Sequence, residues 1–500
     1  MTLPIVDTPI GSPPSVIPER TDRWNPALEA ALYPSSNRQH AIAKLRDPRA
    51  LVVTTGQQAG LFTGPSYAIT KALSARGLAL ALEKRWNRPV VPMYWVPGDD
   101  HDWQEASTAH WLSSDGSLIS ASLPPRAPEA PMTPMWREPL GAAILPALDQ
   151  FEQSFEETGG PGPVADWLRR HYAPTSTVAG AYGAAIAELL GPLGILCLDT
   201  THQAVKRATT PLLLRALERA QELDQLLETS DRALKQKSID AGVVVGDGAT
   251  MVFLEGELGR DRLVLGGKAG VFQLRRTRTS LRLEELHHLA KKEPTRFSAN
   301  VLLRPVLESA LLPTVAYLAG PGELKYLELA APLYEALGVF RQVPVPRWSG
   351  LLVEPRVTRM LKKHGIGVDE LLADSSLERR LARQSFPEGT DAALTQLKAA
   401  IETGYAPVIR AAAAIDPTME SPADAARRKA LYAVDELDKK LVQHARKRES
   451  VELGQVGRAR LSVSPNGKPQ ERVLTMPGFM ARYGDTVLTG LADHIARWYG

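Results

Sequence analysis

Residues Leu51-Val-Val-Thr-Thr-Gly-Gln-Gln-Ala-Gly-Leu-Phe-Thr-Gly-Pro65 join a short apolar run to a glycine-rich loop. The run lacks polar alternation, which is typical of a strand covered on both faces, as in a parallel sheet. The loop leads into a helix predicted from about Pro65 to Glu83, because proline is favoured in the first helical turn. This succession of strand, loop and helix predicts an α/β domain.

Four further apolar runs have the same character, and each also ends in a polar or glycine-rich cluster. They cover residues 90–96, 194–198, 313–318 and 342–346. Five such runs predict a doubly wound parallel sheet. Ligands bind such a sheet beyond the carboxyl ends of its strands, so clusters far apart in sequence are expected to meet at one cleft.

The composition is that of a globular protein with more than one structural unit. The chain has 500 residues, of which 44% are apolar and 23% charged, and its net charge is only +3. A chain this long usually forms two or three units, and so small a positive excess argues against nucleic acid as the main partner. Since the N-terminus does not resemble a signal peptide and no apolar run reaches transmembrane length, we expect a cytoplasmic protein without a membrane partner.

Two stretches interrupt the series of strands. Residues 105–165 are rich in proline, serine and glycine, and residues 241–275 alternate as in β-hairpins. We interpret both as insertions that cap the sheet. The expected organisation is a core of residues 1–104, 166–240 and 296–355, insertions at 105–165 and 241–295, a helical arm at 356–460 and a C-terminal segment at 461–500.

The helical arm shows a heptad pattern. Apolar residues recur at seven-residue spacing at Leu394, Ile401, Val408 and Ile415, with Leu397 and Ala411 between them, and a second series contains Ala430, Val434, Leu437, Leu441 and His444. The two series predict an antiparallel coiled-coil hairpin, a structure that more often serves self-association than catalysis. A further series at Leu213, Ala220, Leu227 and Leu234 offers a third helix to that bundle.

The glycine-rich loop has two interpretations. Gly56, Gly60 and Gly64 would let backbone N–H groups approach an anion at the positive end of the following helix. The loop is neither a Walker motif nor a dinucleotide fingerprint, so a tight turn explains it equally well.

Asp99-Asp-His-Asp102 concentrates three carboxylates and an imidazole where a strand is predicted to end. Neighbouring carboxylates raise one another's pKa unless a cation or solvent stabilises them. The cluster therefore indicates Mg²⁺ coordination, a general base or recognition of a substrate ammonium group. The alternative is a solvated loop in which Asp102 caps a helix.

A second strand-to-helix junction lies at Gly320-Pro-Gly-Glu-Leu-Lys325. Glu323 either stabilises the helix N-terminus or takes part in the site. Arg304, Lys325 and Arg347 are candidates for binding a carboxylate or a phosphate. Cys197 lies in an apolar run and is expected to be a buried core residue rather than a reactive thiol.

Taken together, these segments resemble the bacillithiol synthase family, the cysteine ligases of bacillithiol biosynthesis. The resemblance is carried by the glycine-rich loop, by the acidic cluster with Gly98, and by four further blocks in the family's order. These blocks are Phe297-Ser-Ala-Asn-Val-Leu-Leu-Arg-Pro305, Leu311-Leu-Pro-Thr-Val-Ala-Tyr317 running into Gly320-Pro-Gly-Glu323, Pro469-Gln-Glu-Arg472 and Arg482-Tyr-Gly484.

The resemblance implies a Rossmann-like core with two connective insertions and a coiled-coil domain used for homodimerisation. It also implies a ligase that joins cysteine to the amino group of glucosaminyl malate, with ATP expected and Mg²⁺ as a candidate cofactor. The expected catalytic residues are Asp99, Asp100, His101 and Asp102. The expected substrate- and nucleotide-binding residues are Gly56, Gln57, Gln58, Gly60, Thr63, Gly64, Arg304, Tyr317, Gly320, Gly322, Glu323, Arg347, Gln470, Glu471 and Arg472.

Within this hypothesis, the loop from Gln57 to Gly64 binds substrate or phosphate, Asp100 or His101 removes a proton, and Arg304 or Arg347 binds the malyl carboxylates. Two alternatives stay open. One is a related amide ligase or nucleotidyl-transferase that uses another amine acceptor. The other is a non-catalytic coiled-coil scaffold that keeps a vestigial cleft.

Overall fold

The computed structural model describes residues 3–374, 376–448 and 450–500. The chain divides into two compact units, Met1–Leu352 with Lys468–Gly500, and Val353–Gly467. The expected helical arm at 356–460 falls inside the second unit, whereas most of the expected C-terminal segment folds with the first. No helix in the described ranges combines the length and the apolar character needed to cross a membrane.

The first unit is built on a five-stranded sheet in the order β13-β12-β2-β3-β6, in which every neighbouring pair is parallel. Its strands are β2 (Leu51–Gly56), β3 (Val90–Val96), β6 (Leu196–Asp199), β12 (Thr314–Ala319) and β13 (Val343–Pro346). All five predicted strands are thereby confirmed, as is the α/β fold. Every residue of β2 and β12 is buried, which explains why these runs carry no polar alternation.

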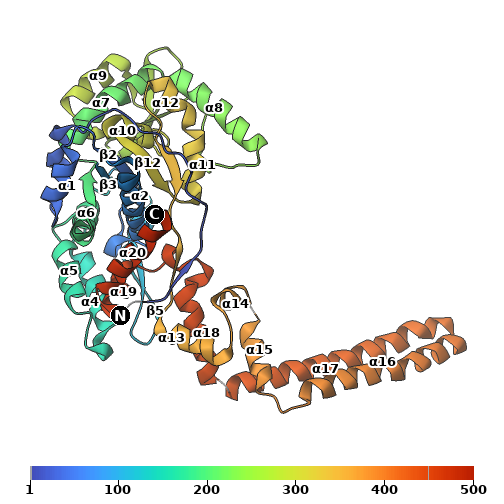
Figure 1. Ribbon diagram of the computed structural model, residues 1–500. Helices are drawn as coiled ribbons and strands as arrows, with labels where there is room; N and C mark the ends of the chain where they lie inside the picture. The colour runs from blue at the N-terminus through green and yellow to red at the C-terminus, as the bar shows by residue number, and fades with distance from the viewer. Residues whose placement is uncertain (1–2, 375, 449) are drawn as a thin grey trace. The chain divides into compact units, whose positions relative to one another are not determined.

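Helices cover both faces of this sheet (Figure 1). Apolar residues of α2 (Tyr67–Trp86) pack on one face, and those of α1 (Arg38–Leu45) pack on the other. The C-terminal helix α20 (Thr486–Tyr499) lies along α2, where Gly77 permits close approach, because a Cβ atom at this position would lie 3.1 Å from the Ile495 carbonyl oxygen. The last residues of the chain therefore complete the first unit.

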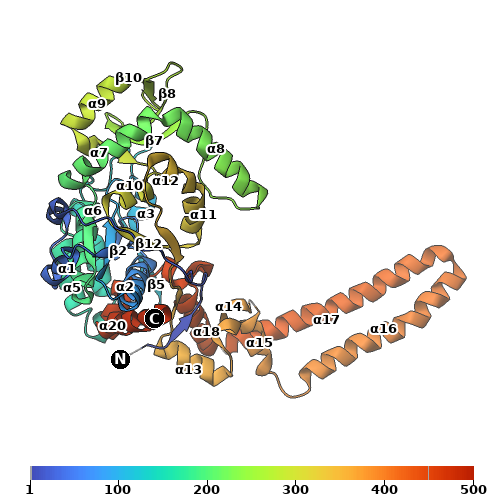
Figure 2. The ribbon, with the colours of Figure 1, turned by 45° about the horizontal axis from the view of Figure 1, so that its top comes forward.

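The second insertion supplies four strands of an antiparallel sheet in the order β10-β9-β8-β7-β11, and β11 follows the expected end of the insertion. The strands of this sheet are β7 (Ala249–Gly256), β8 (Gly259–Leu265), β9 (Val271–Leu274), β10 (Ser280–Arg282) and β11 (Phe297–Ala299). The hairpin pattern predicted within residues 241–275 is present, because β7 and β8 pair antiparallel. Figure 2 shows α7 (Gln203–Glu218) and α8 (Ala220–Gln236) beside this sheet.

The apolar series at 213, 220, 227 and 234 lies on α7 and α8, and it does not serve as a third helix of the coiled coil. Leu213, Ala220, Leu227 and Leu234 are buried in one cluster with residues of β7, β8 and β9, such as Leu254. Their apolar face is already covered within the first unit. The expectation failed because helices packed on a sheet and helices in a bundle share the same spacing of apolar residues.

The remaining elements of the first unit surround these two sheets. They are β1 (Ile5–Asp7), α3 (Trp103–Ala106), β4 (Thr108–Leu112), β5 (Leu118–Ser122), α4 (Leu145–Gln153), α5 (Pro163–His171), α6 (Val178–Leu190), α9 (Leu283–Lys292), α10 (Arg304–Leu311), α11 (Pro321–Leu329), α12 (Ala331–Leu337), β14 (Gly350–Leu352) and α19 (Met476–Tyr483).

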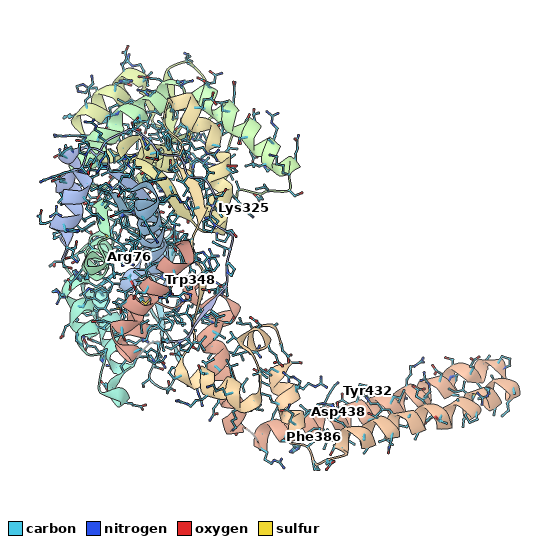
Figure 3. All side chains as sticks on the ribbon, viewed as in Figure 1. Arg76, Lys325, Trp348, Phe386, Tyr432 and Asp438 are labelled. Atoms are coloured by element: carbon cyan, nitrogen blue, oxygen red, sulfur yellow. The ribbon has the colours of Figure 1, made fainter. Side chains whose placement is uncertain are left out.

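The second unit is helical, and its two longest helices form the predicted hairpin (Figure 2). It contains α13 (Pro355–His364), α14 (Val368–Ala373), α15 (Leu377–Gln384), α16 (Thr390–Ile415), α17 (Glu420–Arg448) and α18 (Ser450–Val463). Ion pairs join the arms of the hairpin, one of them between Lys398 and Asp435 at 2.5 Å. Asp438 of α17, labelled in Figure 3, pairs with Arg383 of α15.

The heptad assignment was only partly correct. Leu394 and Ile401 are half-buried, but Leu397, Val408 and Ile415 are exposed, Ile415 by 85%. A straight helix with 3.6 residues per turn drifts by about 20° over each seven-residue step, so residues at strict heptad spacing move away from the contact line with the partner helix unless both helices supercoil. The three exposed residues form an apolar stripe along α16.

We predict that the only cysteine is dispensable for activity. Cys197 lies in β6 with 1% of its surface exposed, and burial raises the pKa of its thiol, which disfavours the nucleophilic thiolate. Cys197→Ala is expected to lower the free energy of unfolding by about 1 kcal/mol and to leave turnover unchanged. Denaturant unfolding and a turnover assay test this, and loss of turnover in the folded variant would instead indicate a catalytic thiol.

Candidate active site

A cavity of about 800 Å³ opens at the carboxyl ends of the parallel strands in the first unit. Residues that follow all five strands line it: Gly56 at the end of β2 with Gln57, Pro97 after β3, Thr200 after β6, Gly320 after β12 and Arg347 after β13. The convergence of distant clusters on one cleft, expected for a doubly wound sheet, is therefore present. The insertion sheet contributes one wall through β7, β8 and β11.

A buried lysine joins the loops that follow β2 and β12. Lys71 of α2 donates hydrogen bonds to the Gly56 carbonyl at 2.6 Å, to Gln57 Oε1 at 3.2 Å and to Glu323 Oε2 at 2.6 Å. Burial lowers the pKa of Lys71, and Glu323 opposes that shift. The three donors of the ammonium group are all used, so Lys71 holds the two loops in position rather than binding a ligand. Sequence reasoning missed it, although a lysine within an apolar helix was a usable signal.

Glu323 receives further hydrogen bonds at this junction. The Gly320 N–H donates to Glu323 Oε2 at 2.8 Å, and the Tyr317 hydroxyl donates to Oε1 at 2.9 Å. Burial alone would raise the pKa of Glu323, but Lys71 and the Gly320 N–H bring it below its ordinary value. The carboxylate is therefore ionised and both stabilises the start of α11 and lines the cavity, together with Gly322 and Tyr317.

Two arginines singled out from the sequence already have carboxylate partners within the protein. Arg304 Nη1 lies 3.1 Å from Glu308 Oε2, and its Nη2 donates to the Tyr317 hydroxyl at 3.1 Å. Arg347 pairs with both oxygens of Glu471 at 2.8 and 2.6 Å. Both arginines line the cavity, but their charges are neutralised and most of their donors are engaged.

The C-terminal residues expected in the site have different positions. Gln470 lies outside the lining and exchanges hydrogen bonds with the backbone N–H and carbonyl of Leu352, each at 2.9 Å. Glu471 is also outside the lining and acts through Arg347. Arg472 lines the cavity and is exposed.

The first half of the glycine-rich loop lines the cavity, and the second half is a turn. Gly56, Gln57 and Gln58 line the cavity, whereas Gly60, Thr63 and Gly64 do not. The Thr63 N–H donates to the Tyr172 hydroxyl at 2.8 Å, and the Gly64 N–H donates to the Leu61 carbonyl at 2.8 Å. The ring of Phe62 packs against Trp111, Phe151 and Tyr172. The second half of the loop is thus a turn in the core, and its N–H groups do not form the expected anion cradle.

The acidic cluster follows β3, and its carboxylates differ in their partners. Asp99 pairs with Lys206 Nζ at 2.6 Å, and Asp102 caps α3 by accepting the Glu105 N–H at 3.2 Å. Asp100 accepts the N–H groups of His101 and Asp102 through Oδ1, at 2.6 and 3.1 Å. None of the described residues donates a hydrogen bond to Asp100 Oδ2. The same holds for Asp102 Oδ2, but Asp102 is exposed, whereas Asp100 is half-buried in the cavity lining. Asp100 is therefore the carboxylate of this cluster best suited to act on a substrate.

His101 lies beside the cavity but not in its lining. Its Nδ1 is 3.1 Å from Nη1 of Arg260, and because a guanidinium can only donate, Nδ1 is the acceptor and the ring is neutral. Burial and the charge of Arg260 lower the pKa of His101. The imidazole therefore orients Arg260 and is poorly placed to take a proton.

This environment predicts how stability changes with pH. A histidine whose folded-state pKa lies below its ordinary value of 6.5 stabilises the fold above that pH, and the contribution is lost as the pH falls through the lower value. Between pH 8 and pH 5 the wild type should therefore lose more free energy of unfolding than His101→Gln, whose amide oxygen can still accept from Arg260. Equal losses in urea titrations would contradict the expectation.

The acidic side chains described around the cavity do not gather into a metal site by themselves. Among residues 3–374, 376–448 and 450–500, no group of three or more histidine, cysteine, aspartate or glutamate side chains could hold one. Asp99 is occupied by Lys206. Mg²⁺ commonly relies on one or two carboxylates together with substrate phosphates. The described residues thus do not form a Mg²⁺ site of their own.

Comparison with known proteins gives concordant matches over nearly the whole chain. Residues 27–348 match the family described as Bacillithiol biosynthesis BshC, N-terminal Rossmann-like domain, and residues 350–497 match the corresponding C-terminal coiled-coil domain. A protein of Symbiobacterium thermophilum is 29% identical, with 95% of this chain and 86% of the relative covered. One of Koribacter versatilis is 30% identical, with 95% and 88% covered. Both relatives are named "Putative cysteine ligase BshC".

Proposed function

Since the chain belongs to the bacillithiol biosynthesis BshC family, we propose that it is an ATP-dependent ligase that joins the carboxylate of cysteine to the amino group of glucosaminyl malate. The observation that carries the proposal is Asp100, a carboxylate without a cationic hydrogen-bond partner in a large cavity at the carboxyl ends of the sheet. A cleft kept only for its shape would not require such a group.

The reaction needs two chemical contributions. A free carboxylate is a poor acylating agent, and ATP supplies its activation. The amino group of the acceptor must lose a proton before it can attack, and Asp100 is placed to accept that proton. The N–H groups of His101 and Asp102 hold Asp100 Oδ1, so that Oδ2 is oriented for proton transfer.

The loops around the cavity are rigidly held. Lys71 connects the loop after β2 to Glu323 at the start of α11. Lys206 connects Asp99 to the Phe297 carbonyl, at 2.9 Å from the latter. These two lysines hold loops that follow different strands in fixed positions around the cavity. Such preorganisation lowers the entropic cost of bringing two substrates together.

The proposal is tested by incubating the purified chain with cysteine, glucosaminyl malate and ATP and following products by mass spectrometry. Bacillithiol is expected only when all three are present. Replacing the acceptor with glucosamine or with other amines distinguishes a related amide ligase. A scaffold would give no product with any acceptor.

We also propose that the coiled-coil hairpin makes the protein a homodimer. Leu397, Val408 and Ile415 leave an apolar stripe exposed on α16 of the single chain.

Val408→Asp with Ile415→Asp should yield a monomer by light scattering with unchanged helical content, because neither residue is buried within its own chain. Val434→Asp is the contrasting variant, since Val434 is buried inside the hairpin and its replacement should unfold the hairpin itself. A double variant that remains dimeric, or a monomeric wild type, would contradict this assignment.

A further inference from the structure

The basic residues that line the cavity fall into two groups. Lys71, Lys206, Arg304 and Arg347 each form an ion pair with a carboxylate. Arg260, Arg262 and Arg472 line the same cavity, and the described residues offer none of them a carboxylate within ion-pair distance. Arg472 is exposed, so solvent screens its charge. Arg260 and Arg262 are less exposed, which leaves their positive charges uncompensated in a partly desolvated position.

These two arginines form a pair on one face of the insertion sheet. They are alternate residues of β8, so their side chains leave the strand on the same side. Both lie against the ring of Phe253 on β7, with the guanidinium carbon of Arg260 at 3.9 Å and that of Arg262 at 5.1 Å from the ring centroid. Phe253 and Arg262 are also register partners across the two strands.

The partners of Arg260 are neutral. Its nitrogens donate to Ser298 Oγ at 2.9 Å and to the Ala299 carbonyl at 2.6 Å, in addition to His101 Nδ1. These bonds fix the orientation of the guanidinium but do not reduce its charge. None of the described residues accepts a hydrogen bond from the Arg262 side chain, so its guanidinium donors are available to a ligand.

The electrostatic surroundings of Arg260 and Arg262 favour the binding of a negatively charged ligand. Burial lowers the pKa of Arg260, and the pKa of Arg262 is lowered by burial and by the charges of Arg275 and Arg260. Asp99 and Asp100 act on Arg260 in the opposite direction, but Asp99 is already paired with Lys206. A ligand with more than one negative charge would compensate both guanidinium groups at once.

Apolar side chains also line the cavity, namely those of Val205, Leu213, Val243, Phe297 and Leu307. A nucleotide combines a planar, weakly polar base with a chain of charged phosphates. An amino-sugar malate carries hydroxyl groups and carboxylates throughout and has no apolar part to set against these side chains.

We propose that Arg260 and Arg262, presented by the β7–β8 hairpin of the second insertion, bind the phosphates of the nucleoside triphosphate. This inference rests on the proposed ligase function and assigns the nucleotide to the insertion sheet rather than to the glycine-rich loop. Arg304 and Arg347, the arginines favoured by sequence, already form ion pairs with Glu308 and Glu471.

Calorimetric titration of the full-length chain tests the proposal without turnover, first with ATP alone and then with glucosaminyl malate alone. Arg262→Gln is expected to weaken ATP binding by about 10- to 100-fold, the effect of losing charge-assisted hydrogen bonds. Arg262→Lys should recover part of the loss, since it keeps the charge but not the planar fork. Arg278→Gln, an exposed arginine of the same insertion outside the lining, is the matched control and should bind ATP as the wild type does.

The outcomes separate this inference from the proposed function. Weaker ATP binding with unchanged acceptor binding supports the phosphate assignment. Weaker acceptor binding with unchanged ATP binding overturns it and places the malyl carboxylates on the hairpin. Equal ATP affinity in wild type and Arg262→Gln, or no ATP binding by the wild type, also overturns it, even if bacillithiol is formed. An Arg262→Gln protein that loses ATP affinity while the wild type ligates no acceptor supports the inference and defeats the proposed reaction. Circular dichroism verifies the fold of each variant, and Arg260→Lys provides the second test if Arg262→Gln does not fold.

Discussion

Replacing Glu471 with alanine is expected to destabilise the first unit by about 3–5 kcal/mol, the usual cost of removing one partner from a buried ion pair. The side chains of Arg347 and Glu471 are only 3% and 6% exposed and are joined by two hydrogen bonds. Ser349 Oγ also donates to Glu471 at 2.8 Å. The variant would leave the Arg347 guanidinium buried without its counter-charge.

Urea unfolding of the first unit measures the effect. Arg347→Met combined with Glu471→Met should recover most of the loss, because the double variant leaves no unpaired charge in the interior. Glu188→Ala is the matched control, since the exposed Glu188 pairs with Arg170 and His171 and should contribute no more than about 1 kcal/mol per pair. A loss below that level in Glu471→Ala would show that the C-terminal segment is not anchored by this pair.

The sheet could be predicted from sequence because each buried strand is a contiguous signal. The runs at 51–56, 90–96 and 314–319 contain no charged residue and are mostly apolar. They can be recognised without knowledge of any distant residue. The position of the cleft followed from the same reasoning, since ligand sites of doubly wound sheets lie at the carboxyl ends of the strands.

The partners of charged residues could not be predicted in this way. Arg347 is separated from Glu471 by 124 residues and Lys71 from Glu323 by 252, and a sequence shows a charge without showing what neutralises it. From the sequence, Arg304 and Arg347 are therefore expected to bind substrate, whereas nothing in it singles out Arg260 and Arg262. The buried face of the coiled-coil hairpin was predicted only in part for a related reason, because a heptad pattern does not record whether its helices supercoil.

Asp100→Asn is expected to lower turnover by about 10²- to 10⁴-fold, the contribution typical of a general acid or base. The substitution keeps an oxygen that can accept the N–H groups of His101 and Asp102, so the loop after β3 should retain its structure. What it removes is the negative charge and the capacity to take a proton. The loss should therefore appear in kcat, while calorimetric binding of ATP stays near the wild-type affinity if the phosphates lie at Arg260 and Arg262.

The control for this variant is Asp166→Asn, a change of the same chemistry on the exposed side of α5 and outside the cavity lining. It should turn over like the wild type.

Raising the pH tests the role of Asp100 further, since a larger unprotonated fraction of the acceptor amine reduces the need for a base. Turnover of Asp100→Asn should consequently recover at alkaline pH relative to the wild type. Wild-type turnover of a folded Asp100→Asn protein at neutral pH would remove Asp100 from the mechanism and leave proton transfer to another carboxylate of the cavity, with Glu105 the next to test because burial and the charges of Asp102 and Asp100 raise its pKa.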